Sequence, residues 1–273
     1  MRIGLLATYV IGLLASGAFA QDAGLKSLQT GVDASPWEAV GRLDIGGNGF
    51  CTGALIAPDL VLTAAHCLFD KTSGERIDHN TVEFLAGWRN GRASAYRQVR
   101  RAVVHKKYTY NRDVSSERVR NDVALLELAH PIRNTRIEPF HTAAQPEQGD
   151  RVGVVSYARD RAEAPSLQEV CEVLGLQDGV LVTSCSVDFG SSGAPIFTFS
   201  NGMAHIVSVV SAKAEIDGHK VSLGTELSTP LSDLRAELES GGGVFLKSLP
   251  KTNRVSVGEV RRDTGAKFIR PEN

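Results

Sequence analysis

The chain has 273 residues, with 30 basic and 31 acidic side chains and a hydrophobic fraction of 42%. This length is enough for one large all-β domain or for two small lobes that share a cleft. The balanced charge argues against the broad basic face by which proteins attract nucleic acids or anionic membranes, so neither is an expected partner.

The first 20 residues have the pattern of a secretory signal peptide. Arg2 supplies an early positive charge, a short apolar run follows, and Ala18-Phe19-Ala20 fits a cleavage site before Gln21. The alternative is a membrane anchor, but the apolar run is short and lacks a charged stop. We therefore expect a secreted or periplasmic monomer that has no membrane attachment after cleavage.

Short apolar runs separated by turn residues continue from Trp37 to about Leu227. The runs are rich in Val and Leu and are bounded by Gly, Pro, Asp or Asn, which predicts strands. Long helical periodicity is missing, so the expected class is all-β, a barrel or a sandwich. Residues 21–35 are predicted to be a lead or pro-segment, and residues 36–240 the domain.

One helix is predicted near the end of this domain. Thr229 is expected to cap it, Pro230 suits its first turn, and Gly241 marks its end. Three leucines share the face that we expect to be buried, namely Leu231, Leu234 and Leu238. The basic tail over residues 241–273 is expected to be a solvated, mobile end.

The even number of cysteines predicts disulfides in an exported chain. The four are Cys51, Cys67, Cys171 and Cys185. They allow three pairings, of which the pairing of sequence neighbours closes two short loops. Because the chain has no Cys-x-x-Cys and its seven histidines are scattered, we expect no metal site and no cofactor.

Three segments each offer one component of nucleophilic acyl transfer by serine. That chemistry needs a hydroxyl, a base within hydrogen-bond reach, an acidic group that orients the base, and donors for the oxyanion. His66 follows a predicted strand beside Cys67, and Asp122 precedes an apolar run. Gly190 and Gly193 flank two serines in a tight turn. Each segment alone is weak evidence, since each also suits an ordinary turn or surface position.

Together the three segments resemble the chymotrypsin-like serine proteases of the trypsin fold. Residues 63–67 read T-A-A-H-C, residues 121–126 read N-D-V-A-L-L, and residues 190–195 read G-S-S-G-A-P, in the family's order. The approach to the histidine, from G-F-C-T-G to A-A-H-C, also matches the family's disulfide-bearing segment. V-V-H-K-K-Y before the aspartate and I-V-S after the serine match as well. The resemblance implies two six-stranded antiparallel β-barrels with the active site between them and a C-terminal helix.

The resemblance also assigns roles residue by residue. It makes Ser192 the nucleophile, His66 the general base and acid, and Asp122 the group that orients the histidine. The backbone N–H groups of Gly190 and Ser192 would form the oxyanion hole, and Ser208 would support the aspartate. The implied activity is a secreted serine endopeptidase acting on protein or peptide substrates.

The chain departs from the animal members of the family at Ser191. Those members carry an aspartate there, which pairs with a new N-terminal amine, and they begin Ile-Val-Gly-Gly. Here the corresponding stretch reads T-G-V-D-A-S-P-W. We therefore expect no maturation through that ion pair and a closer similarity to the bacterial glutamyl-endopeptidase-like branch.

The substrate pocket is less clear from the sequence. Trypsin-type members carry an aspartate where this chain has Ser186, and Asp188 lies nearer to the nucleophile. Glutamyl-specific members carry a histidine on the substrate-binding strand, where this reading places Val207. Val209 and Val210 would replace the usual Trp and Gly and narrow the pocket. These features predict a small or medium apolar side chain at P1, the substrate residue before the scissile bond.

The sequence disfavours two alternative functions. A non-catalytic secreted homologue acting as a binding module is disfavoured because all three catalytic residue types are present. An α/β-hydrolase esterase needs its Asp and His after the serine. Only Asp217 and His219 follow closely in that order, and they lie too near each other, so this alternative is disfavoured too.

Overall fold

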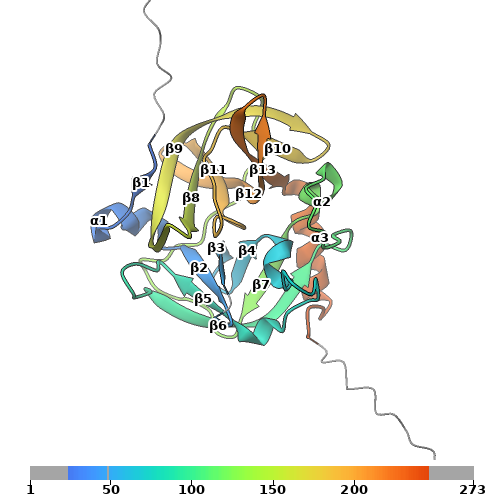
Figure 1. Ribbon diagram of the computed structural model, residues 1–273. Helices are drawn as coiled ribbons and strands as arrows, with labels where there is room; N and C mark the ends of the chain where they lie inside the picture. The colour runs from blue at the N-terminus through green and yellow to red at the C-terminus, as the bar shows by residue number, and fades with distance from the viewer. Residues whose placement is uncertain (1–23, 48, 246–273) are drawn as a thin grey trace, which may run out of the picture.

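The computed structural model describes residues 24–47 and 49–245 of the chain. The predicted signal peptide over residues 1–20 lies outside these residues. Two bodies of antiparallel strands lie one above the other, with helices at their sides (Figure 1). Among the described residues, no helix is long and apolar enough to cross a membrane.

The first body is a closed barrel of six strands in the order β2-β3-β4-β7-β6-β5. Consecutive strands of the chain, β2 to β7, form this barrel. Side chains alternate between the inside and the outside along each strand, so one face of every strand can be buried in the barrel. Its strands are β2 (Val40–Ile45), β3 (Phe50–Ala57), β4 (Leu60–Thr63), β5 (Val82–Ala86), β6 (Ala95–Val104) and β7 (Ala124–Leu128).

The second body is a sheet in the order β1-β9-β10-β13-β12-β11-β8, which an additional β9–β8 pairing closes into a ring. Six strands form the ring and β1 adds to β9, so the predicted pair of six-stranded barrels is confirmed. Its strands are β1 (Lys26–Ser27), β8 (Arg151–Ala158), β9 (Arg161–Gln177), β10 (Val180–Thr183), β11 (Pro195–Ser200), β12 (Met203–Ile216) and β13 (His219–Glu226).

Apolar side chains fill both barrels and the space between them. One cluster lies inside the first barrel around Phe84 and Leu126, and another inside the second around Ile196. A third cluster contains residues of both barrels, including Leu62 and Phe197. Burying a large apolar side chain contributes about 1.5–3 kcal/mol, so this shared cluster fixes how the two barrels meet. The cleft that carries the site is therefore held by a rigid base.

The described part of the lead packs against the second barrel. β1 pairs with β9, Leu28 is buried, and its N–H donates to the carbonyl of Pro165 at 2.9 Å. α1 (Gly31–Ala34) and a short 3-10 helix (Ser35–Trp37) follow. The sequence placed the start of the domain at residue 36, but the packed body begins about ten residues earlier. Small and polar residues predominate in this stretch, and its buried apolar side chains are Leu28 and Ala34.

The predicted C-terminal helix is present as α3 (Ser228–Glu239), but it begins earlier than expected. Leu227 is its N-cap residue and makes no side-chain cap hydrogen bond, so Thr229 is a helical residue and not the cap. Gly241 follows the helix with φ of +88°, which suits glycine. The three predicted leucines are buried: Leu231, Leu234 and Leu238.

The first residues of the predicted tail also pack on the first barrel. The N–H of Ala102 donates to the carbonyl of Gly243 at 3.0 Å, and the ring of Phe245 meets that of His79 edge-on. The rest of the tail lies outside the described residues. The remaining short helices are α2 (Ser116–Arg120) and two 3-10 turns, Ala65–Leu68 and His79–Thr81.

The cysteines form the pairing of sequence neighbours. Cys51 is bonded to Cys67, and Cys171 is bonded to Cys185. Each bond closes a short loop, and a cross-link over about 15 residues contributes roughly 3 kcal/mol in the chain-entropy description. Two such bonds are consistent with an oxidising compartment.

Candidate active site

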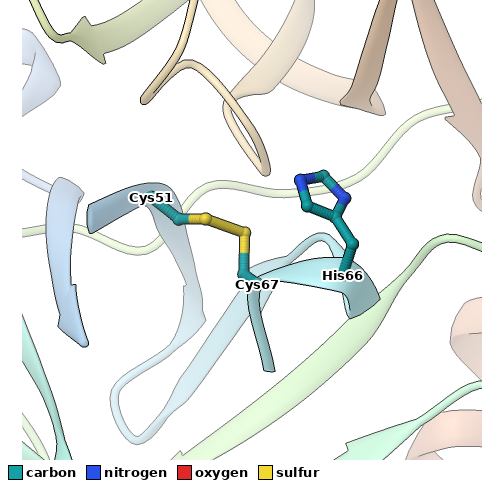
Figure 2. A group of neighbouring side chains, drawn as sticks. All are labelled: Cys51, His66 and Cys67. Atoms are coloured by element: carbon teal, nitrogen blue, oxygen red, sulfur yellow. A yellow bond between two sulfur atoms is a disulfide. The ribbon is translucent and has the colours of Figure 1, made fainter. Parts of the chain in front are cut away.

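His66 lies on the 3-10 turn Ala65–Leu68, directly after β4. The neighbouring Cys67 is bonded to Cys51 on β3, which fixes the backbone that carries the imidazole (Figure 2). The three side chains lie within 4.8 Å of one another. This proximity is not a metal site, because the two sulfurs are bonded to each other and a metal needs free thiolates.

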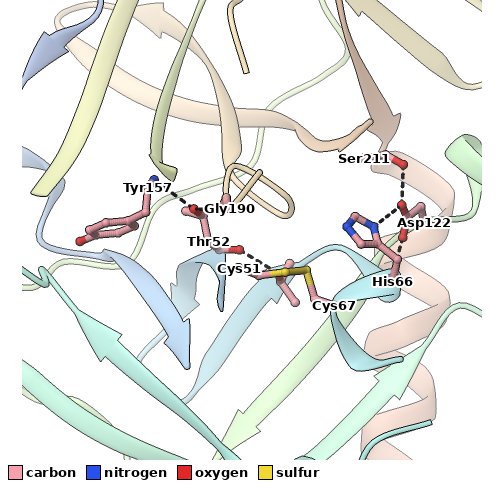
Figure 3. Close-up of a disulfide and its surroundings, with 9 residues drawn as sticks. Cys51, Thr52, His66, Cys67, Asp122, Tyr157, Gly190 and Ser211 are labelled. Carbon is pink, nitrogen blue, oxygen red and sulfur yellow. Dashed lines mark hydrogen bonds and ion pairs between the residues drawn. A yellow bond between two sulfur atoms is a disulfide. The ribbon is translucent and has the colours of Figure 1, made fainter. Parts of the chain in front are cut away.

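Asp122 lies between α2 and β7 and holds His66 through two hydrogen bonds. Its Oδ2 is 2.7 Å from His66 Nδ1, and its Oδ1 accepts from the His66 backbone N–H at 2.8 Å (Figure 3). The Asp122 side chain is fully buried, and the His66 side chain is 13% exposed. A carboxylate that binds both the ring and the backbone fixes the position of the imidazole and favours the proton on Nδ1.

Ser211, not Ser208, supports Asp122. The Ser211 hydroxyl donates a hydrogen bond to Asp122 Oδ2 (Figure 3), whereas the Ser208 hydroxyl donates to the Thr225 carbonyl at 2.8 Å. The prediction that Ser208 supports the aspartate is therefore wrong, and Ser211, three residues later, has this role. The pairing of β12 with β13 shifts register between Val210 and Ala212. Ser211 lies at this irregularity, which no motif marks.

The environment of Asp122 keeps it ionised. Burial acts to raise the pKa of its carboxyl, but the attraction of His66 and the hydrogen bonds from His66 and Ser211 outweigh burial. The net effect lowers the pKa of Asp122 below its ordinary value of 3.8. A negative charge is thus available beside the imidazole throughout the neutral range.

Replacing Ser211 with alanine is expected to lower kcat/KM roughly tenfold. A hydrogen bond to a charged group contributes about 1.5–3 kcal/mol, and its loss would weaken the hold on Asp122. Steady-state cleavage of a peptide checks this, with Ser208→Ala as the matched control. We expect the control to reduce stability but to change kcat/KM less than threefold. If kcat/KM fell equally in the two variants, Ser211 would not be the residue that supports Asp122.

Ser192 and His66 line one cavity of about 410 Å³ between the barrels. Ser192 lies in the turn between Asp188 and β11, and its side chain is half-buried. No hydrogen bond joins the Ser192 hydroxyl to the His66 ring in the described residues. Such bonds are often long in the unbound state of an enzyme and shorten when substrate is present.

The turn before Ser192 presents two backbone N–H groups that have no acceptor among the described residues, those of Gly190 and Ser192. The carbonyl of Phe189 accepts from the Arg159 N–H at 2.7 Å. Because the C=O and N–H of a trans peptide point in opposite directions, this bond turns the Gly190 N–H away from Arg159. The carbonyl of Ser192 accepts from the Thr52 N–H at 2.8 Å, which fixes the next part of the turn.

Glycines are required in this turn for two separate reasons. Gly190 has φ of +102° and Gly193 has φ of +75°, both in the region that favours glycine. A Cβ on Gly193 would also lie 2.1 Å from Thr63 Oγ1 and 2.5 Å from the Thr52 carbonyl oxygen. The first barrel therefore presses directly against the turn that carries Ser192.

Of the four residues predicted to bind substrate, Asp188 and Val210 line the cavity. Ser186 does not: it is exposed, and its N–H donates to Gln168 Oε1 at 2.7 Å. Ser208 is buried under β13 and does not line it either. Val209 does not line the cavity, and Val210 is followed in the lining by Ser211, Ala212 and Lys213.

The sequence did not predict that Lys213 and the loop over residues 110–118 line the cavity. Lys213 Nζ lies 2.8 Å from Asp188 Oδ1, and it also lies 4.5 Å from the centre of the Phe189 ring. The pKa of Asp188 is lowered, first by the hydrogen bond from Lys213. No motif marks these residues, because their places in the cavity depend on how β12, which carries Lys213, and the loop are arranged in the fold.

The fold, the His66–Asp122 pair and the nucleophile turn define a class of protein, and comparison with known proteins agrees with it. The family model described as Trypsin matches residues 29–225, which is more than half of the chain. The chain belongs to the trypsin family.

Individual relatives are similar at low identity. Glutamyl endopeptidase from Bacillus licheniformis is 27% identical over 173 residues, which are 63% of this chain and 52% of the relative. Trypsin theta from Drosophila erecta is 36% identical over 89 residues, which are 33% of this chain and 30% of the relative. The chain thus spans about half or less of the length of these two curated relatives.

A solved structure shows the same fold. A Glu endopeptidase in complex with MPD superposes with a TM-score of 0.64 at 16% identity, over 79% of this chain and 97% of that one. At this identity the likeness concerns the fold alone. It agrees with the mostly β architecture and with the two barrels described above.

Proposed function

We propose that the protein is a serine endopeptidase that hydrolyses peptide bonds through an acyl-enzyme. One observation supports this above the rest: a buried carboxylate holds an imidazole at 2.7 Å, and that imidazole lines the same cavity as Ser192. Membership of the trypsin family supports a hydrolase that acts on proteins.

In the proposed reaction the Ser192 hydroxyl attacks the carbonyl carbon of the scissile bond. His66 Nε2 takes the hydroxyl proton and later gives it to the leaving amine, while Asp122 stabilises the imidazolium. The N–H groups of Gly190 and Ser192 would donate to the oxyanion, whose stabilisation by preorganised donors is a large part of catalysis. Water then enters by the same path, with His66 again as base, and releases the acid.

The proposed P1 preference is a small or medium apolar side chain. Val187 and Val210 line the cavity beside Ser192, and neither carries a charge that would pair with an ionised P1 residue. The only carboxylate among the lining residues is Asp188, which is paired with Lys213. A P1 profile dominated by Arg, Lys or Glu would overturn this preference.

We also propose that the protein acts outside the cytoplasm as a monomer, without maturation through an N-terminal ion pair. The two disulfides support an oxidising compartment. In place of the aspartate of animal members, Ser191 is fully buried, and its hydroxyl contacts Ser156 Oγ at 3.1 Å and the Tyr157 carbonyl at 3.2 Å. These neutral partners satisfy the position without a charged amine.

Labelling with a fluorophosphonate tests the proposed function. The reagent is expected to modify the protein once, and mass spectrometry is expected to place the adduct on Ser192. Labelling should disappear in Ser192→Ala and persist in Ser191→Ala, whose hydroxyl is buried and bonded elsewhere. A wild-type protein that does not react would contradict catalysis and favour a binding module.

A further inference from the structure

Cationic side chains gather around the cavity that contains Ser192. Lys71, Arg112 and Arg118 line it together with His66 and Ser192; we name these three the cationic rim. They form no ion pair with any described residue, whereas the fourth cation of the cavity, Lys213, is paired with Asp188. The whole chain has a net charge of −1, so this excess of positive charge is local.

The rim is held in place by contacts that leave its charge unneutralised. Arg112 Nη2 donates to the carbonyls of Lys71 and Thr72 at 3.1 and 3.2 Å, which ties the loop over residues 110–118 to the loop after His66. Arg118 Nη1 contacts the Asn111 carbonyl at 3.4 Å, and its Nε is buried without a hydrogen-bond partner. A buried N–H without an acceptor carries a cost, and carbonyl contacts do not cancel the charge.

Surface cations usually have no function beyond solubility, but the rim differs from scattered surface charge in two respects. Lys71 comes from the loop after His66, and Arg112 and Arg118 come from residues 110–118, and these two segments converge on the cavity that contains the candidate nucleophile. The pocket beside Ser192 is apolar, through Val187 and Val210, so a carboxylate would be recognised outside it. Guanidinium groups bind carboxylates through paired, charge-assisted hydrogen bonds.

We propose that the cationic rim selects substrates with acidic side chains at positions flanking the scissile bond, other than P1. This deepens the proposed function and rests on it. An Asp or Glu at such a position would approach Lys71, Arg112 and Arg118 while the P1 side chain occupies the apolar pocket. Complementary charge of this kind increases both association rate and specificity, and it weakens as salt is added.

Peptides with one fixed apolar P1 residue test this inference. Asp or Glu is placed in turn at each of the three positions before P1 and the four positions after the scissile bond, and each peptide is compared with its Asn or Gln isostere. At one position or more, the acidic peptide is expected to show about tenfold higher kcat/KM at low salt, and the ratio should fall toward one in 0.5 M salt.

Charge-neutralising variants link the preference to the rim. Lys71→Gln and Arg112→Gln are each expected to lower the acidic-to-neutral ratio of kcat/KM at least threefold, because each variant loses more activity on the acidic peptide than on its neutral isostere. Arg136→Gln is the matched control, because Arg136 is exposed and does not line the cavity. An acidic-to-neutral ratio close to one at every position in the wild type would overturn the inference. So would a decrease of this ratio in Arg136→Gln as large as that in the rim variants.

A binding measurement separates this inference from the proposed function. Fluorescence anisotropy of the same peptides with the Ser192→Ala protein needs no catalysis. Tighter binding of an acidic peptide, lost in Lys71→Gln, supports the rim even if the wild-type protein cleaves nothing. If the protein cleaves neutral peptides and shows no preference for acidic ones, the proposed endopeptidase function stands and the proposed role of the cationic rim is wrong.

Discussion

Replacing Asp122 with asparagine is expected to lower kcat about 10⁴-fold, the size of effect known for this exchange in a serine protease triad. The amide keeps the shape of the side chain but presents an NH₂ group where Asp122 Oδ2 now lies 2.7 Å from His66 Nδ1. The ring would then hold its proton on Nε2 and could not accept the proton of Ser192. Single-turnover cleavage of an activated ester measures the loss directly.

Asp188→Asn is the matched control for this experiment. Asp188 is the other carboxylate near Ser192, but its side chain is 51% exposed and pairs with Lys213 rather than with His66. We expect its replacement to change kcat less than tenfold. If Asp122→Asn retained a tenth or more of the wild-type kcat, the His66–Asp122 pair would be structural and not catalytic.

The lowered pKa of Asp122 gives the same pair a predictable pH dependence. A carboxyl whose pKa is lower in the folded than in the unfolded state contributes stability at pH values above its unfolded pKa, about 3.9. This contribution is lost as the pH falls through the folded value. The stability that Asp122 contributes is therefore complete above about pH 4 and decreases below it.

The three segments that we propose to be catalytic can be recognised in the sequence because each is a short run with its own chemistry. T-A-A-H-C, N-D-V-A-L-L and G-S-S-G-A-P place histidine, aspartate and serine without knowledge of the fold. The supporting serine could not be placed in this way. The strand offers I-V-S and V-V-S in succession, and no motif marks the register shift between Val210 and Ala212, where Ser211 contacts the aspartate.

The pocket was harder to predict for a related reason. The position of Ser186 outside the cavity depends on its bond to Gln168, a residue of β9 that is distant from the nucleophile turn in the sequence. The cationic rim likewise depends on the approach of two loops, which Arg112 links through the carbonyls of Lys71 and Thr72. Such contacts leave no periodic pattern in the sequence.

Replacing Gly193 with alanine is expected to cost about 2–4 kcal/mol of stability and to lower kcat/KM at least about 10²-fold. The added Cβ would lie within 2.8 Å of three atoms, Thr63 Oγ1, the Thr52 carbonyl oxygen and the Ala64 nitrogen. Overpacking costs about 1–3 kcal/mol, and a left-handed backbone adds about 1 kcal/mol for alanine. The turn must move, and a displacement of about 1 Å at a reacting group is enough for the loss of activity.

Gly202→Ala separates the two contributions. Gly202 has φ of +76°, nearly that of Gly193, but nothing lies within 4 Å of its Cβ position in the turn between β11 and β12. Denaturant unfolding should show a loss of about 1 kcal/mol for this control and no change in peptide cleavage. If the two variants lost equal stability, backbone strain alone would explain why position 193 requires glycine. Contact between the first barrel and the Ser192 turn would then not be what holds the nucleophile in place.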